Sequence, residues 1–122
     1  WDSLFPAQKP ADHAQYRQAL RDNLREPGRI TAFRRLMLNV NDAHAALDGV
    51  HVPTTIMMGA KDHDFKNPVQ EALELGKTLG ASVHIIDNAG HYPHVEMHEQ
   101  VCPLVTDFLR NAHPTSQADR AA

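Results

Sequence analysis

The sequence has only one cysteine, Cys102, among its 122 residues. A single thiol cannot form an intrachain disulfide, and it excludes a metal site built from several thiolates. Long apolar runs are also missing, because no stretch approaches the roughly 20 residues that cross a bilayer. No charged segment followed by an apolar one marks a signal peptide. We therefore expect a soluble protein without a membrane partner, in a reducing compartment such as the cytoplasm.

Neither sign of charge is in large excess. Twelve Lys and Arg against fifteen Asp and Glu give a formal charge of −3, which implies no polyanionic partner. Six arginines recur at helical spacing, but no aromatic platform is interleaved with them, and Asp22 and Glu26 dilute their charge. We expect a solvated helix face and no nucleic-acid partner. The six are Arg17, Arg21, Arg25, Arg29, Arg34 and Arg35.

The first 48 residues have the pattern of a helical segment. Apolar positions recur at helical spacing in residues 11–25 and again in residues 30–40, with a Pro-Gly turn between them. Asn41 or Asp42 could cap a short third helix. We interpret residues 1–48 as a helical cap. Its apolar stripe could either line a substrate pocket or pack against the rest of the protein.

A strand, a helix and a strand follow the cap. Thr54–Met58 is an apolar, β-branched run without alternation, which is typical of a strand covered on both faces. Asn67 begins the helix, with a proline at its first position and Gln70 placed as in a capping box, and Gly80 ends it. Ser82–Ile86 is the second strand. Strand, helix and strand with short connections predict a parallel pair.

A last helix closes the core. Its apolar residues recur at helical spacing, and Pro103 is tolerable there only if it sits within about the first turn. We assign residues 49–112 to the core. Residues 113–122 offer nothing to bury, so we expect a flexible tail. The apolar positions of the last helix are Val101, Leu104, Val105, Phe108 and Leu109.

Two parallel strands with flanking helices form an incomplete sheet. Parallel sheets occur almost only where both faces and most edges are covered, so the fold class is α/β with strands missing. The chain also starts at Trp1 with bulky apolar residues where polar, mobile ones are expected, so it looks cut. The other strands would come from an N-terminal half of the same protein, from a second chain, or from another copy in a homo-oligomer.

An acid and a histidine follow the two strands. Asp62 comes just after the first strand and His91 just after the second, at the edge where open α/β sheets hold their ligands. An acid so placed would accept the Nδ1 proton of His91 and leave Nε2 free as a general base. Asp64 is a rival acid, but we expect its side chain to hydrogen-bond the backbone of its own loop.

The order and spacing of several motifs resemble the C-terminal half of an α/β-hydrolase. The motifs are Val-Pro at 52–53, Gly-Ala-Lys-Asp at 59–62, Ala-Gly-His-Tyr-Pro-His-Val-Glu at 89–96 and the closing helix. The resemblance is close over residues 52–111 and looser for the cap helices at 11–47. It implies a partial α/β-hydrolase fold with the last two parallel strands of the sheet. It also assigns the catalytic acid to Asp62 and the catalytic histidine to His91.

The sequence departs from that family at the nucleophile. The G-x-S-x-G elbow and the oxyanion-hole loop have no counterpart, because Ser3, Ser82 and Ser116 do not lie between paired glycines. Cys102 lies on the last helix. This chain alone is therefore expected to be inactive, with a Ser, Asp or Cys nucleophile outside it. The resemblance implies a hydrolase that acts on a small, largely apolar, ester-like substrate without a cofactor.

Four apolar side chains are candidate substrate contacts. Phe65 and Tyr92 flank the acid and the histidine, and either could wall a pocket or simply pack. Phe33 and Met37 belong to the apolar stripe of the cap.

A metal site is the alternative use of the histidines. His91, His94 and His98 have spacings of three and four, and Glu96 or Asp62 could complete a shell. Pro93 interrupts the first pair, so we expect no metal site and a structural role for His94 and Glu96. Two other functions stay open: a non-catalytic binding or assembly module that keeps the half-fold, and a histidine-rich metal-binding protein.

Overall fold

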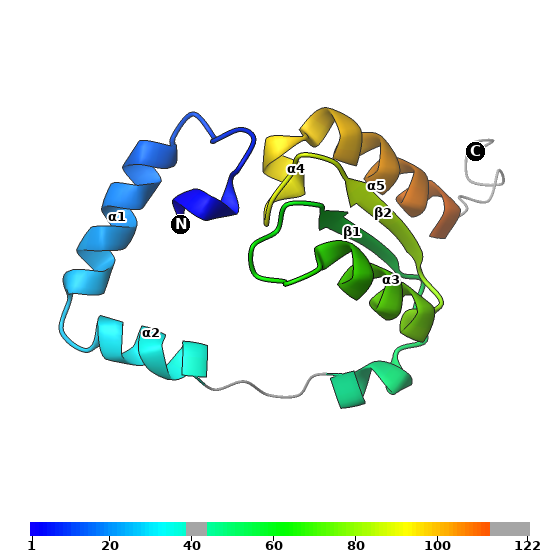
Figure 1. The fold of residues 1–122 in the computed structure, drawn as a ribbon, viewed down its shortest axis with the longest axis horizontal. Coiled ribbons are helices and arrows are strands. Elements are labelled where there is room, and N and C mark those ends of the chain that lie inside the picture. The colour runs from blue at the N-terminus through cyan, green and yellow to red at the C-terminus, as the bar shows by residue number, and fades with distance from the viewer. Residues whose placement is uncertain (39–43, 113–122) are drawn as a thin grey trace, which may run out of the picture.

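The computed structural model describes residues 1–38 and 44–112 and shows a mixed α/β arrangement (Figure 1). It confirms the α/β class that the sequence predicts. None of the helices within these residues is long and apolar enough to cross a bilayer. In chain order the elements are the 3-10 helix η1 (Asp2–Leu4), α1 (His13–Arg25), α2 (Arg29–Leu38), the 3-10 helix η2 (His44–Gly49), β1 (Thr55–Gly59), α3 (Pro68–Leu79), β2 (Ser82–Ile86), α4 (Pro93–Glu96) and α5 (His98–Ala112).

The two strands form a parallel pair, as predicted, with Thr55 opposite Ser82 at one end and Gly59 opposite Ile86 at the other. Gly76 of α3 packs against Val83, whereas Ile86 packs against Val101 of α5. Side chains three positions apart on a strand point to opposite faces. Helices α3 and α5 therefore cover opposite faces of the sheet (Figure 1). Within the described residues there is no third strand.

Helix α3 has the ends that its sequence predicts. The Asn67 side chain accepts a hydrogen bond from the Gln70 backbone N–H at 3.1 Å, and Gly80 ends the helix at a φ of 61°. A left-handed φ suits glycine because it has no Cβ. The capping-box prediction was wrong in its second half, since the Gln70 side chain donates to Glu74 at 2.8 Å instead of reaching back to Asn67. Glu74, four residues further along the helix, competes with the Asn67 backbone for the Gln70 side chain.

Helix α5 carries Pro103 deeper than expected. The helix begins at His98, so Pro103 lies in the second turn and not in the first. Proline has no backbone N–H, so Pro103 cannot donate the helical hydrogen bond to the Glu99 carbonyl. Pro103 lies on an exposed face of the helix. A further short helix, α4, lies between β2 and α5, and no sequence pattern predicted it.

Helices α1 and α2 form a pair that stands apart from the sheet (Figure 1). Gly28, at a φ of 82°, makes the turn between them. The apolar stripe of α2 is exposed, with Phe33 46% and Met37 62% accessible. The alternative in which this stripe packs on the core is therefore not what the structure shows. Asn41 and Asp42, the expected caps of a third helix, lie outside the described residues, as does the predicted tail.

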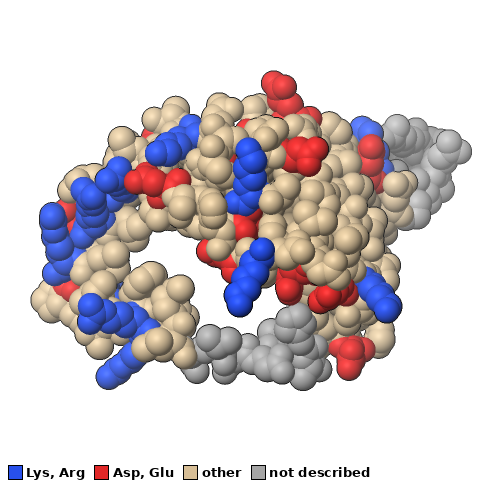
Figure 2. Space-filling view, viewed as in Figure 1, with Lys and Arg blue, Asp and Glu red and all other residues tan. Residues whose placement is uncertain are grey.

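The basic side chains of α1 and α2 lie along the outer edge of this helix pair (Figure 2). Arg25 pairs with Asp22 at 3.2 Å, and Arg29 pairs with Glu26 at 3.1 Å. These pairs are more than half exposed, so each adds little stability. They form the solvated helix face that the sequence predicts.

Gly59 provides a direct test of this arrangement. A Cβ at Gly59 would press on the Gly90 carbonyl oxygen and lie 2.6 Å from the Ala89 carbonyl oxygen. Because both atoms belong to backbone, no side-chain rotation relieves the contact. We predict that Gly59→Ala lowers the free energy of unfolding by about 1 to 3 kcal/mol, measured by chemical denaturation.

The matched control is Gly49→Ala, where no heavy atom lies within 4 Å of the added Cβ. This variant should keep or slightly raise the wild-type stability. Equal stabilities for the two variants would contradict the close approach of the loops that follow β1 and β2.

Candidate functional site

The loops that follow the two strands are hydrogen-bonded to each other. Ala60 N–H donates to the Ile86 carbonyl at 3.1 Å, and Lys61 N–H donates to the Ala89 carbonyl at 2.9 Å. These bonds extend the pairing beyond the end of β1. They bring Asp62, the next residue, to the loop that carries His91.

Asp62 and His91 meet as the sequence predicts. The His91 Nδ1 lies 3.0 Å from Oδ2 of Asp62 in a hydrogen bond. Asp62 is only 5% exposed, and its Oδ1 accepts the backbone N–H of Asp64 at 3.0 Å. With both oxygens engaged, the carboxylate is fixed in orientation. Since an ionised carboxylate can only accept, Nδ1 carries the proton in this bond, and Nε2 has no partner in the described part of the chain.

Asp64 lies differently from expectation. Its Oδ2 is 3.3 Å from the same Nδ1, and its side chain is 55% exposed. The prediction that its carboxylate binds its own loop was wrong. Within this loop it is the backbone N–H of Asp64 that donates a hydrogen bond, to the carboxylate of Asp62. Asp62 is the better placed acid, because it is buried and aligned in a hydrogen bond, whereas solvent screens Asp64.

The same three side chains are a candidate metal-ligand set. Ligand atoms of Asp62, Asp64 and His91 all lie within 4.8 Å of one another. Carboxylate and imidazole donors suit divalent cations such as zinc. This set differs from the histidine series considered from the sequence, in which His94 and His98 are both exposed.

An aromatic cluster surrounds the residue after His91. The Tyr92 ring lies edge-on to His91 at 4.9 Å and stacks on Phe5, also at 4.9 Å. Trp1 in turn stacks on Tyr16 of α1. The sequence showed Trp1 and Phe5 only as unusual residues for a terminus. We call Trp1, Phe5, His13, Tyr16 and Tyr92 the aromatic cluster.

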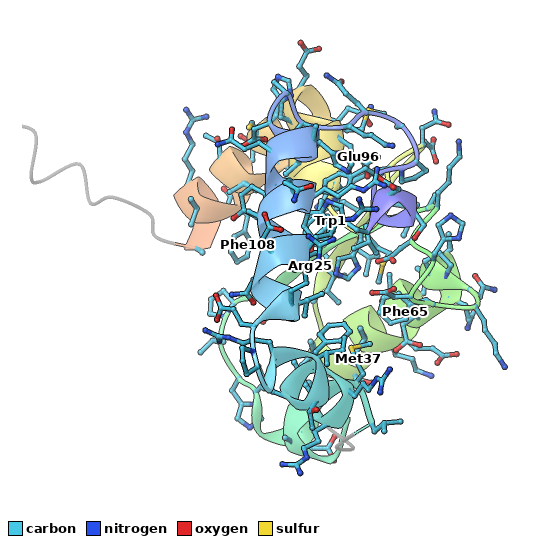
Figure 3. All side chains as sticks on the ribbon, turned by 90° about the vertical axis from the view of Figure 1, so that its left-hand side faces the viewer. Trp1, Arg25, Met37, Phe65, Glu96 and Phe108 are labelled. Carbon is cyan, nitrogen blue, oxygen red and sulfur yellow. The ribbon has the colours of Figure 1, made fainter. Side chains whose placement is uncertain are left out.

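A cavity of about 410 Å³ opens beside this cluster. Its volume suits a small organic molecule. Tyr92 lines it, but the other predicted substrate contacts, Phe65, Phe33 and Met37, do not. Phe65 is half-buried on the loop after β1, and Met37 lies on α2 (Figure 3). The lining residues are Trp1, Pro10, Asp12, His13, Tyr16, Tyr92, His94 and Val95.

Glu96 is a buried carboxylate whose position could not be read from the sequence. It is 2% exposed, and its Oε1 accepts the Gly90 N–H at 2.6 Å. Its Oε2 accepts the Ala7 N–H at 2.8 Å and faces the Gln8 N–H at 3.4 Å. These contacts give Glu96 the structural role that we expected for it.

The candidate nucleophiles within the chain lie elsewhere. Ser82 Oγ donates to Thr55 Oγ1 at 3.0 Å, at the opposite end of the strands from His91. Cys102 is exposed on α5. In the described ranges, His91 makes no hydrogen bond to a serine, threonine or cysteine.

Comparison with known proteins found no family model, no curated protein and no solved structure that matches this chain.

The roles of the two acids can be separated by the tautomer of His91. In Asp62→Asn the amide can turn its NH₂ toward Nδ1, which then accepts, so the ring proton moves to Nε2. We predict this switch for Asp62→Asn at neutral pH, measured by two-bond ¹⁵N–¹H correlation spectra. Asp64→Asn is the control and should keep the Nδ1–H form. The reverse pattern would make Asp64 the acid.

Asp2 holds the N-terminal segment to α1. Its carboxylate lies 3.2 Å from Arg17, 3.3 Å from His13 and 3.4 Å from Lys9. Desolvation pushes the pKa of Asp2 upward, but the charges of Arg17, Lys9 and His13 outweigh it and leave the pKa below its ordinary value. The pairs with Arg17 and Lys9 are partly exposed, so salt weakens them.

This lowered pKa predicts an acid transition. Because the folded pKa is lower than the unfolded one, the pairs stabilise the segment above the ordinary aspartate pKa and are lost as pH falls through the folded value. We expect the fluorescence of Trp1, the single tryptophan, to change below about pH 4. Asp2→Asn should remove that step. An identical pH curve for the variant would show that Asp2 does not hold the segment.

Proposed function

We propose that this chain is the cap and C-terminal half of an α/β-hydrolase, in which Asp62 and His91 are the acid and the histidine of a nucleophile–histidine–acid triad. The observation that carries the proposal is the 3.0 Å hydrogen bond between a buried carboxylate and a partly exposed imidazole. The two groups stand on loops after adjacent parallel strands, where α/β sheets hold their catalytic residues.

In this proposal each residue has a separate part. Asp62 accepts the Nδ1 proton, fixes the ring and stabilises the imidazolium that forms, without being protonated itself. Nε2 of His91 takes the proton of the attacking hydroxyl or thiol and then delivers it to the leaving group. With an aspartate nucleophile, His91 would instead activate water against the covalent intermediate. None of these steps needs a cofactor.

The nucleophile and the oxyanion donors come from outside this chain in this proposal. The parallel sheet has only two strands among the described residues, and α2 exposes apolar side chains such as Leu36 and Met37. An N-terminal half of the same protein, a second chain or another copy would complete the sheet and cover these side chains.

The substrate would be small and largely apolar, with an ester-like bond. Tyr92 stands edge-on to His91 and lines the cavity beside the aromatic cluster, so an aromatic wall of the cavity belongs to the residue that follows the histidine. Phe65, Phe33 and Met37 stay predicted contacts from the loop after β1 and from the cap.

A non-catalytic assembly module is the second candidate. It is favoured by the same exposed stripe, where Leu36 is 72% and Leu38 82% accessible, since exposed apolar patches mark interaction surfaces. A third candidate, a divalent-cation site, would use Asp62, Asp64 and His91.

One set of assays separates the three candidates. The polypeptide in which this chain naturally occurs is assayed on p-nitrophenyl butyrate, alongside the 122-residue chain alone. We expect turnover by the former only, and a loss of at least about 1,000-fold in kcat on His91→Ala. His98→Ala, an exposed histidine at the start of α5 that does not line the cavity, is the control and should keep the wild-type rate.

The other outcomes each favour a rival. A stable oligomer without turnover would favour the assembly module. A stoichiometric metal content, with activity that EDTA removes, would favour the cation site. Full activity of His91→Ala would rule out the triad.

A further inference from the structure

The loop that carries His91 rests on the N-terminal segment, residues 1–8, at successive positions. The His91 N–H donates to the Leu4 carbonyl at 3.1 Å. The next residue, Tyr92, stacks its ring on Phe5 at a centroid distance of 4.9 Å. Trp1, at the start of this segment, and Glu96, on α4, are labelled in Figure 3. The candidate catalytic histidine therefore lies on residues that precede the cap helices.

Glu96 joins the residue before His91 to the same segment. One carboxylate oxygen accepts the Gly90 N–H at 2.6 Å, and the other accepts the Ala7 N–H at 2.8 Å. Glu96 and Ala7 are 89 positions apart in the sequence. A single buried side chain therefore bridges the histidine loop and the N-terminal segment.

The burial of Glu96 makes this bridge cooperative. The side chain is 2% exposed and makes no ion pair with any described residue. A buried carboxylate needs hydrogen-bond donors, and here backbone N–H groups supply them. If the segment moves away, Oε2 loses Ala7 and the charge is left without compensation. Docking of the segment and the position of the loop are thus linked.

Gly90 shows how closely the two parts meet. A Cβ at this position would press on the Pro6 ring and lie 2.7 Å from the Leu4 carbonyl oxygen. The loop backbone at Gly90 therefore lies directly against the Pro6 ring and the Leu4 carbonyl, with no room for a side chain at position 90.

We propose that Glu96 is a positioning residue that makes the placement of His91 depend on the docked N-terminal segment. Because Trp1 of this segment stacks on Tyr16 of α1, a movement of the cap would be transmitted to the histidine loop. The catalytic meaning of this link rests on the proposed function, but the link itself can be measured without any activity.

The first test uses Glu96→Gln in the 122-residue chain. Glutamine keeps one acceptor oxygen, so its NH₂ faces either the Gly90 or the Ala7 N–H. We expect loss of the His91 Nδ1–H proton resonance through exchange with water, together with a shift of Trp1 fluorescence toward the solvent-exposed value. Glu99→Gln, on the exposed first turn of α5, is the control and should change neither signal.

The second test changes the N-terminal segment and leaves the histidine loop as it is. Ala7→Pro deletes the N–H that Glu96 accepts and leaves both Glu96 and His91 untouched. It should cause the same loss of the His91 resonance. Ala11→Pro is the matched control, because the Ala11 N–H makes no hydrogen bond within the described structure.

A His91 resonance that persists in both Glu96→Gln and Ala7→Pro, while Trp1 fluorescence shifts, would overturn the link. In the active polypeptide, Glu96→Gln should lower kcat by roughly 10-fold to 100-fold with KM nearly unchanged. Loss of the resonance in a protein without esterase activity would refute the proposed function and leave the link standing.

Discussion

The close approach of two backbones at the ends of β1 and β2 is the constraint on which the structure depends. Parallel strands end at one edge of the sheet, and the loops after them share hydrogen bonds from Ala60 and Lys61. Gly59 has no room for a Cβ against the Ala89–Gly90 backbone. Only this approach places the Asp62 carboxylate against the His91 ring.

Two buried carboxylates then fix His91 from different sides. Asp62 holds the ring through Nδ1, and Glu96 holds the preceding backbone through Gly90. Each is also compensated by N–H groups, from Asp64 in one case and Ala7 in the other. A buried charge that loses such donors is strongly unfavourable, so both interactions favour one geometry of the loop. The N-terminal segment therefore contributes to the support of the histidine loop.

Local signals made much of the fold predictable. The period of the apolar residues, the Asn67 cap and the Gly80 stop define the strand–helix–strand unit, and the parallel rule then places Asp62 beside His91. Contacts between distant residues were not predictable. The bond from Ala7 to Glu96 and the stacking of Phe5 on Tyr92 have no sequence period. The same holds for the exposed stripe of α2, since a pattern shows that a face is apolar but not what covers it.

The proposed triad depends on a contact between one carboxylate and one imidazole. A crystal structure of the chain tests it most directly, through the separation of His91 Nδ1 and Asp62 Oδ2. We expect a separation of about 3.0 Å, with Asp62 buried. A separation beyond roughly 3.5 Å, with His91 turned toward solvent or bound to Asp64 alone, would contradict it.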